Sequence, residues 1–327
     1  MLSKKVNNVY LHQNYGIAGK NENNHVLKDI NFLKDFYGGE DSVETCEIKM
    51  NEIVLENLIN DHTNLVIGGN LDNQLTGVSY ALKNRNLAYL GIYNACATFT
   101  EGLIIGSKFC SKKDLIVLTS SHNLISERQF KYPIEYGSPN KDYATFTTTG
   151  SIGVILSNRP SNIRLECYTI GDVIDYEVYD ASNMGAVMAP GAYHTIIKHL
   201  KDFKRDITYY DLILTGDLGK YGLMILKELL KKDNITTSNI IDAGSLLYPL
   251  DDDKAGGSGP VCLPLILFKK VLFNKKYQRI LLVGTGALHS KVLVDQHLPI
   301  PTIAHAVAIE VIEWFLSIVF YAVECYV

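Results

Sequence analysis

Residues 94–103 read Asn94-Ala95-Cys96-Ala97-Thr98-Phe99-Thr100-Glu101-Gly102-Leu103. A strand-like apolar run precedes this stretch, and the pattern after it is typical of a helix. The small residues at the junction predict a turn that places the Cys96 sulfur at a helix N-terminus. There the first backbone N–H groups are unpaired and the helix dipole favours an anion, so the pKa of a thiol is lowered. Cys96 is therefore a candidate nucleophile, and a small buried apolar cysteine is the alternative.

Short apolar runs alternate with helical patterns around this turn. Strands are expected at residues 9–11, 64–69, 88–93 and 115–119, and helices at residues 40–60, 74–83 and from Cys96 onward. Residues 13–25 are polar and rich in asparagine, which predicts a loop. The alternation of strands and helices predicts an α/β fold with crossover connections.

The second half of the chain repeats the order of the first. Residues 211–218 echo residues 64–71, and residues 265–286 echo residues 103–121. Where the first half carries the Cys96 turn, the second half carries Ala255-Gly256-Gly257-Ser258-Gly259. The repetition predicts two copies of one βαβ-rich unit that share a core. The expected division is an N-terminal half over residues 1–158, a C-terminal half over residues 159–310 and an apolar tail over residues 311–327.

Composition and charge exclude several classes of protein. Of the 327 residues, 47% are hydrophobic and 20% are charged, which is typical of a globular protein rather than a disordered one. The formal charge of −4 gives no reason to expect a nucleic acid partner. Six scattered cysteines form no C-x-x-C pair, so neither a metal site nor a disulfide framework is expected. No cofactor-binding fingerprint is present, so no cofactor is expected.

The duplicated α/β pattern with a cysteine on an N-A-C-A turn resembles the thiolase fold of thiolases and ketoacyl synthases. Over residues 8–310 the chain resembles one family more closely, the stage V sporulation protein AD family. The matching motifs are Thr119-Ser120-Ser121-His122-Asn123, the run from Ser126 to Gly137, Thr147-Thr148-Thr149-Gly150, the run from Asn183 to Pro190, Thr215-Gly216-Asp217-Leu218, the glycine-rich turn and Ile303-Ala304-His305-Ala306-Val307.

This resemblance implies a layered α-β-α-β-α architecture and a role in sporulation. It also implies binding of dipicolinic acid, as the acid or its calcium chelate, for uptake into the spore. The expected location is peripheral, on the inner forespore membrane, with the other SpoVA membrane subunits as partners. A homodimer is expected, because proteins of this fold generally pair through a strand next to the nucleophile turn.

The resemblance does not extend to the catalytic partners of the fold. Ketoacyl synthases carry a histidine after the strand equivalent to residues 211–215 and an asparagine on the later glycine-rich turn. Here those places read Gly216-Asp217-Leu218-Gly219 and Ala255-Gly256-Gly257-Ser258-Gly259. A thiol without a base is poorly activated, and a nearby aspartate opposes thiolate formation. We therefore expect a protein that is not an enzyme. His122, His289 and His305 are the candidates to replace the missing base, but no motif places any of them beside Cys96.

The expected ligand pocket is the former acyl site. Dipicolinate is a flat ring with two carboxylates, so it needs N–H or cationic donors and an apolar slot. The residues assigned to the pocket are Cys96, His122, Arg128, Lys131, Asp217, Gly256, Gly257, Ser258 and His305. Two other functions stay open: an active acyltransferase that uses Cys96, and a structural scaffold whose cleft is filled by side chains. For Arg128 and Lys131, a surface loop or a subunit interface is the alternative.

The segment from residue 311 onward departs from the family pattern. It is apolar but interrupted by Glu313 and Glu324, and it is shorter than the roughly 20 apolar residues of a membrane span. An interfacial anchor and an unnatural tail are both compatible with this sequence.

Overall fold

One mixed sheet runs through the whole molecule. The computed structural model describes residues 1–23, 25–130, 141–248 and 255–312. Within this part of the chain, ten strands follow one another in the order β11-β10-β13-β14-β9-β2-β8-β6-β4-β5. Two further strands pair beside this path, β1 (Leu2–Lys5) with β9 and β3 (Asn31–Phe32) with β2.

The sheet consists of two sets of five strands with the same order. The first set is β2 (Tyr10–Ala18), β4 (Thr63–Gly69), β5 (Ala88–Gly91), β6 (Asp114–Ser121) and β8 (Gly150–Ser157). The second set is β9 (Ile163–Ile170), β10 (Leu212–Thr215), β11 (Ile240–Asp242), β13 (Arg279–Ala287) and β14 (Thr302–Val311). In each set, the last strand lies antiparallel between the first and the fourth, and the second lies parallel between the third and the fourth. The structure therefore has the duplicated α/β arrangement that the sequence predicts.

The two sets join where β2 and β9 pair antiparallel, at Tyr10 with Arg164 and Leu11 with Ile163. The predicted division at residues 158 and 159 falls in the connection between β8 and β9. Strand β14 ends at Val311, one residue beyond the predicted end of the second half. Residues 313–327 of the predicted tail lie outside the described residues.

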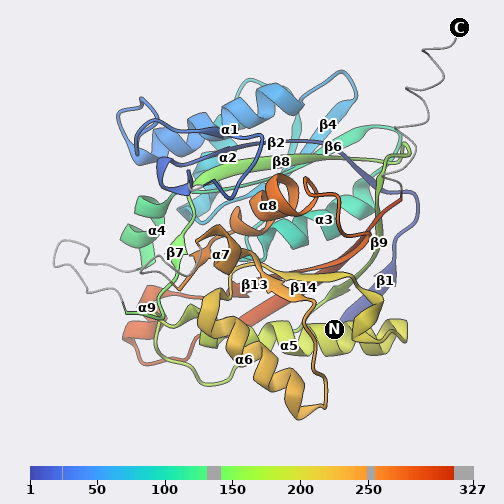
Figure 1. Ribbon diagram of the computed structural model, residues 1–327. Coiled ribbons are helices and arrows are strands. Elements are labelled where there is room, and N and C mark those ends of the chain that lie inside the picture. The colour runs from blue at the N-terminus through green and yellow to red at the C-terminus, as the bar shows by residue number, and fades with distance from the viewer. Residues whose placement is uncertain (24, 131–140, 249–254, 313–327) are drawn as a thin grey trace, which may run out of the picture.

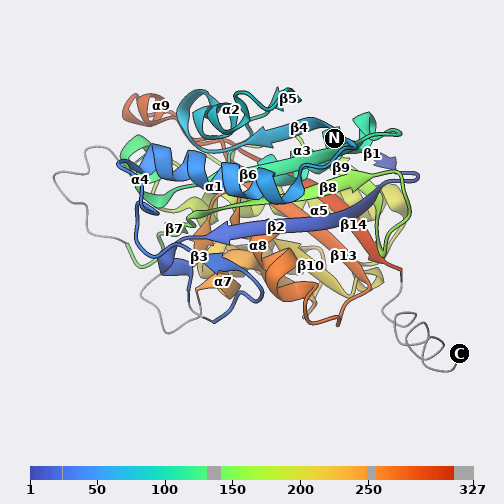
Figure 2. The ribbon, with the colours of Figure 1, turned by 90° about the horizontal axis from the view of Figure 1, so that it is seen from above.

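Helices form three layers around the sheet (Figure 1). The middle layer holds α3 (Thr98–Phe109), α8 (Cys262–Ile266) and the π-helical turn η5 (Leu267–Val271), packed in one apolar cluster with strands of both sets. On the outside, α1 (Val43–Leu58) and α2 (Thr76–Leu82) pack on the first set. On the opposite side, α5 (Met184–Phe203) and α6 (Gly219–Lys232) pack on the second set. Together with the two sets of strands between them, these helices make the five layers of the predicted architecture. The view from above looks down on this stack, with α1 in front of the strands of the first set (Figure 2).

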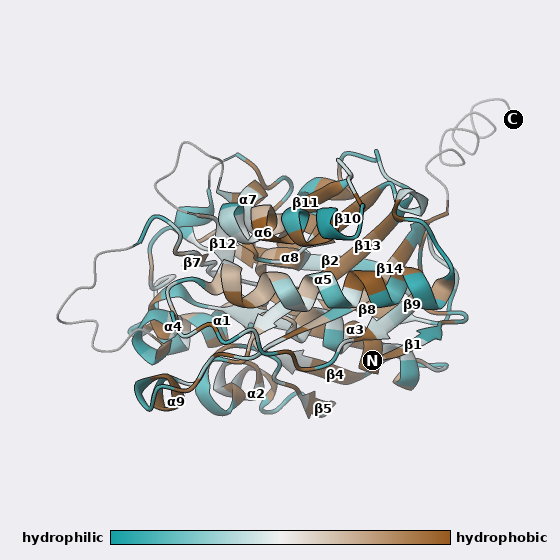
Figure 3. Ribbon diagram, turned by 90° about the horizontal axis from the view of Figure 1, so that it is seen from below, coloured by the Kyte–Doolittle hydropathy of each residue, from teal (hydrophilic) through white to brown (hydrophobic). Residues whose placement is uncertain are grey.

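The burial pattern explains this layering. Strands β6 and β8 are buried along their whole length, which is typical of strands covered by helices on both faces. Figure 3 shows the same contrast in hydropathy, since β13 and β14 are mainly hydrophobic while the outer helices carry hydrophilic residues. The start of α1 is fixed by a capping box in which Ser42 and Thr45 exchange side-chain and backbone hydrogen bonds.

The prediction of a loop over residues 13–25 is wrong for its first part. Strand β2 continues to Ala18, because its second half pairs with β8 and because Ile17 and Ala18 are buried. The polar side chains of this segment do not give the sequence pattern of a strand. A shift in register between Leu11 and Asn14 also breaks the regular alternation of side chains between the two faces of the sheet.

Several short elements gather at one end of the molecule, beyond the carboxyl ends of the parallel strands. They are α4 (Asn123–Phe130), β7 (Phe146–Thr147), α7 (Ala243–Leu247), β12 (Gly257–Ser258) and α9 (Lys291–Asp295). Ligands bind outside the carboxyl ends of strands in α/β sheets, so this end is where a site is expected. None of the helices in the described ranges is long and apolar enough to cross a membrane.

Candidate functional site

Cys96 lies on a tight turn at the start of α3, as predicted. Ala95 has a positive φ of 48°, a backbone conformation that costs a residue with a Cβ on the order of 1 kcal/mol. The turn is held by Thr98, whose hydroxyl donates to the Ala95 carbonyl at 2.6 Å and accepts from the Asn94 N–H at 3.0 Å. This bend leaves the Cys96 side chain partly exposed at the helix start.

A buried histidine supports the turn from below. His305 accepts a hydrogen bond at Nδ1 from the Gly171 N–H at 3.2 Å, and its Nε2 lies 2.8 Å from Nδ2 of the Asn94 amide. Burial lowers the pKa of His305 to about 4, so the ring is neutral at physiological pH. Both ring nitrogens are therefore occupied in holding the turn, and His305 acts as a structural support for Cys96.

The second half of the chain places an aspartate against the thiol. Asp217 follows β10 and forms a side-chain hydrogen bond with Cys96. The Thr285 hydroxyl donates to Oδ1 of Asp217 at 2.6 Å, and the Gly259 N–H donates to Oδ2 at 3.4 Å. Burial raises the pKa of Asp217 to about 7 despite these hydrogen bonds.

This arrangement opposes the formation of a thiolate. Loss of solvent around the thiol raises the pKa of Cys96 well above its usual range, and the charge and hydrogen bond of Asp217 raise it further. The Gly259 N–H acts in the opposite direction but is the weaker influence. Since the thiolate is the nucleophilic form, Cys96 is not activated in this site.

The glycine-rich turn forms the wall opposite Cys96. Its strand β12 pairs with β7, and Gly259 has a φ of +100°, which a residue with a side chain rarely adopts. At Gly257 a Cβ would lie 2.9 Å from Oγ1 of Thr148 and 3.2 Å from the Cys262 sulfur. The turn therefore has no room at residue 257 for the asparagine side chain that ketoacyl synthases carry on their glycine-rich turn.

A cavity of about 70 Å³ opens above Cys96. Its apolar lining comes from Leu71, Tyr93, Ala95, Phe130, Ala181, Met184, Met188 and Ala287, and its polar lining from Cys96, Ser126, Glu127, Thr145, Thr147, Ser182, Ser258, Gly259 and His289. Sites for drug-sized ligands measure roughly 300–1,000 Å³, so this cavity suits a smaller ligand. It is not filled by side chains, as a purely structural scaffold would require.

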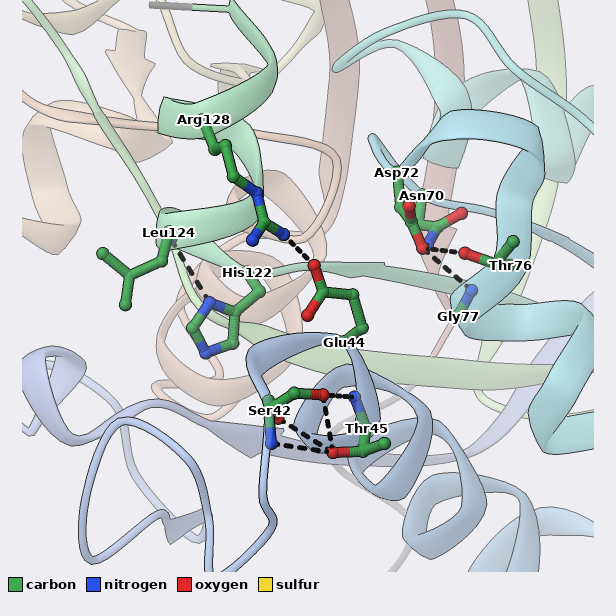
Figure 4. A network of polar contacts seen from close by, with 10 residues as sticks. All are labelled: Ser42, Glu44, Thr45, Asn70, Asp72, Thr76, Gly77, His122, Leu124 and Arg128. Atoms are coloured by element: carbon green, nitrogen blue, oxygen red, sulfur yellow. Dashed lines mark hydrogen bonds and ion pairs between the residues drawn. The ribbon is translucent and has the colours of Figure 1, made fainter. Parts of the chain in front are cut away.

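A wider hollow of about 490 Å³ adjoins the cavity on its outer side. Three side chains, Tyr93, Phe130 and His289, line both spaces. The outer wall includes the loop before α2, where Asp72 accepts hydrogen bonds from the Thr76 hydroxyl and the Gly77 N–H (Figure 4).

The structure brings some of the predicted ligand residues together and leaves others apart. Cys96 and Ser258 line the cavity, while Asp217 lies against Cys96. Gly256 and Gly257 shape the turn without lining the cavity, and His305 lies beneath it.

His122 and Arg128 lie on α4 or at its start but outside the cavity lining. His122 is 2.9 Å from the Phe36 carbonyl and accepts from the Leu124 N–H, which caps the helix (Figure 4). Arg128 is not part of the cavity lining, and it forms an ion pair with Glu44 of α1 (Figure 4). Lys131 lies outside the described residues.

Ser126 and His289 are two of the cavity residues that were not assigned to the pocket from the sequence. Ser126 begins the motif that carries the family resemblance, but a serine on a polar helix gives no sign of facing a cavity. His289 was considered only as a replacement base, and it lies in the loop after β13, 193 positions from Cys96 in the sequence. Only the fold brings these two side chains to Cys96.

Comparison with known proteins agrees with the predicted family. A family model described as stage V sporulation protein AD matches residues 3–310. The stage V sporulation protein AD of Bacillus subtilis (strain 168) is 39% identical over 262 residues, which are 78% of this chain and 78% of that protein.

Solved structures confirm the thiolase-like fold. OleA from Xanthomonas campestris matches with a TM-score of 0.61 and 13% identity, covering 94% of this chain and 99% of that chain. FabH, the 3-oxoacyl-(acyl carrier protein) synthase III of Xanthomonas oryzae pv. oryzae, matches with a TM-score of 0.58 and 11% identity, covering 93% and 99%. The 3-oxoacyl-[acyl-carrier-protein] synthase III of Aquifex aeolicus VF5 matches with a TM-score of 0.58 and 13% identity, covering 92% of this chain and 99% of that chain. Such low identities show the fold alone.

Proposed function

Since the chain belongs to the stage V sporulation protein AD family, and is therefore a sporulation protein, we propose that it binds dipicolinate without catalysing a reaction. The ligand occupies the cavity above Cys96, and binding serves uptake of dipicolinate into the spore. The contact between Cys96 and Asp217 is the observation that carries this proposal. It places a carboxylate where condensing enzymes of this fold carry a histidine, and the charge of that carboxylate adds to burial in keeping the thiol protonated.

The cavity supports a small planar ligand. Phe130, Met184 and Met188 offer an apolar slot for a ring, and Ser258 and Gly259 border its polar side. The cavity of about 70 Å³ is small for a ligand site, and the adjoining hollow of about 490 Å³ offers further space on its outer side. The small inner space favours a compact ligand over an extended acyl chain beside the thiol.

The charge of the cavity bears on the form of the ligand. Glu127 lines the cavity and Asp217 lies behind Cys96, so a free dianion meets nearby carboxyl groups. In the 1:1 calcium chelate the two positive charges of the metal balance the dianion, and carboxylate oxygens are preferred ligands of calcium. Asp217, with a pKa of about 7, also loses its charge when it takes up a proton.

Calorimetric titration of the full chain tests the proposal. Dipicolinate, with and without calcium, is expected to bind, and acetyl-CoA is expected to leave no acetyl adduct on Cys96 in mass spectra. Arg128→Ala serves as a matched control, because this side chain pairs with Glu44 outside the cavity and its loss is expected to change the affinity less than about twofold. An acetyl adduct without dipicolinate binding would favour the acyltransferase. If neither dipicolinate binding nor an adduct is seen, the result would favour the structural scaffold.

The proposal places the protein on the inner forespore membrane as a peripheral component. The described helices include none that could span a bilayer, so attachment through the other SpoVA membrane subunits is the proposed arrangement. Co-purification of the full chain with those subunits from detergent extracts tests it, and recovery of the chain without any of them would contradict it.

A homodimer belongs to the same proposal. Strand β5 is an edge of the sheet, and Leu90 on this strand and Tyr93 just after it are 38% and 47% exposed. An unpaired edge with exposed apolar side chains can pair with the same edge of a second copy.

Leu90→Lys is expected to convert the dimer to a monomer, because a charged side chain on the edge strand blocks pairing. Sedimentation velocity at micromolar concentration measures the change. Met224→Lys is the control, since Met224 is 57% exposed on the outer helix α6, and this variant should stay dimeric. A wild-type chain that sediments as a monomer at the same concentration would contradict the dimer.

A further inference from the structure

Two side chains of the cavity carry buried polar atoms that lack partners. Within the described residues, neither Nδ1 nor Nε2 of His289 has a hydrogen-bond partner, and the same holds for Oγ of Ser126. All three atoms are buried, and both residues line the cavity above Cys96. Most buried polar side-chain atoms in proteins are paired, and each unpaired one costs roughly 1–3 kcal/mol.

The two residues come from different parts of the fold. Ser126 lies on α4 of the first half, and His289 lies between β13 and α9 of the second half. The His289 ring packs on Phe130, with ring centroids 5.4 Å apart. This packing holds the imidazole at the cavity without satisfying either nitrogen.

We propose that Ser126 and His289 form a carboxylate-binding pair, in which the serine hydroxyl and one imidazole N–H donate to the same carboxylate of the bound ligand. The inference rests on the proposed function and adds the residues that recognise the ligand. Its chemical class is a planar aromatic carboxylate, with the ring in the apolar part of the cavity beside Met184 and Met188. The pair supplies the donors that Arg128, directed toward Glu44, does not.

The charged groups near His289 predict a proton uptake on binding. Burial lowers the pKa of His289, Lys291 of α9 lowers it further, and Asp295 of α9 raises it. Glu127 of α4, Cys96 and Tyr93 line the same cavity. An anion against the ring favours the imidazolium, so binding should take up a proton and the affinity should rise as the pH falls from 8 to 6.

Calorimetric titration of the full chain with dipicolinate at pH 6 and pH 8, in two buffers of different ionisation enthalpy, tests the pair. Ser126→Ala and His289→Phe are each expected to weaken binding by about tenfold or more. His289→Gln keeps an N–H donor but cannot titrate, so it should bind within a few-fold of the wild type at pH 8 and lose the proton uptake. Ser79→Ala is the matched control, because this serine lies on α2 outside the cavity lining and its hydroxyl donates to the Thr76 carbonyl.

The outcomes separate this inference from the function on which it rests. If the wild type binds dipicolinate and the Ser126 and His289 variants bind it equally well, the carboxylate-binding pair is refuted and the proposed function stands. If the wild type does not bind dipicolinate, both are refuted. Circular dichroism of each variant shows whether it is folded. If His289→Phe does not fold, His289→Gln, which keeps a polar side chain, provides the test.

Discussion

Replacing Asp217 with asparagine is expected to make Cys96 react at least about tenfold faster with iodoacetamide at pH 8. The asparagine keeps an oxygen that can accept from Thr285, but it carries no negative charge against the thiol. The pKa of Cys96 should then fall toward its usual range, although burial continues to raise it. Each unit of that fall gives about tenfold more thiolate, and only the thiolate reacts. Mass spectrometry of the alkylated Cys96 peptide over time measures the rate.

Two variants control this measurement. Cys96→Ser gives the background from the other cysteines of the chain. Asp211→Asn removes a carboxylate from the surface at the start of the same segment, where it accepts from the Gln278 and Arg279 N–H groups, and should leave the rate unchanged. If Cys96 of Asp217→Asn reacts no faster than that of the wild type, burial alone keeps the thiol protonated and Asp217 does not suppress thiolate formation.

The Cys96–Asp217 contact shows how much of the site could be predicted from the sequence. Small residues around Cys96 predict the turn from the local sequence, because turn residues are set by the nearby chain. The aspartate after β10 could be placed near the thiol only through the resemblance to ketoacyl synthases, which carry a histidine at the equivalent place. The repeated strand order could also be predicted from the local sequence, because each half carries its own copy of the pattern.

The ligand side of the site depends on contacts between distant segments, and the sequence does not show these. Arg128 looks like an anion donor beside aromatic residues, but the start of α1 brings Glu44 within reach of its guanidinium. Nothing in the sequence indicates that Ser126 and His289 face a common cavity, because only the fold brings α4 and the loop after β13 together there. The part of β2 beyond Leu11 was missed because its burial comes from pairing with β8 and not from its own composition.

A second carboxyl group, outside the cavity lining, is expected to make the stability depend on pH. Glu47 of α1 is buried, and its Oε1 accepts from the Ser120 hydroxyl at 2.7 Å and from the Asn70 amide at 3.0 Å. Burial raises the pKa of Glu47 from 4.5 to about 7 against these hydrogen bonds. The folded chain therefore holds this proton more tightly than the unfolded chain. The resulting stability is fully present below pH 4.5 and is lost as the pH rises through 7.

Glu47→Gln should remove this dependence, because glutamine keeps an oxygen for both donors and has no charge to bury. Relative to the wild type, the free energy of unfolding of the variant is expected to rise between pH 5 and pH 8.5 by up to about 3 kcal/mol. Urea unfolding at both pH values measures the difference, and taking it between variant and wild type cancels the similar trend of Asp217 and Asp242. Glu56→Gln on the same helix is the control, since its exposed carboxylate contacts only Arg85 among the described residues. A difference at Glu47 that does not change with pH would mean that water or a rearranged Asn70 relieves the buried charge.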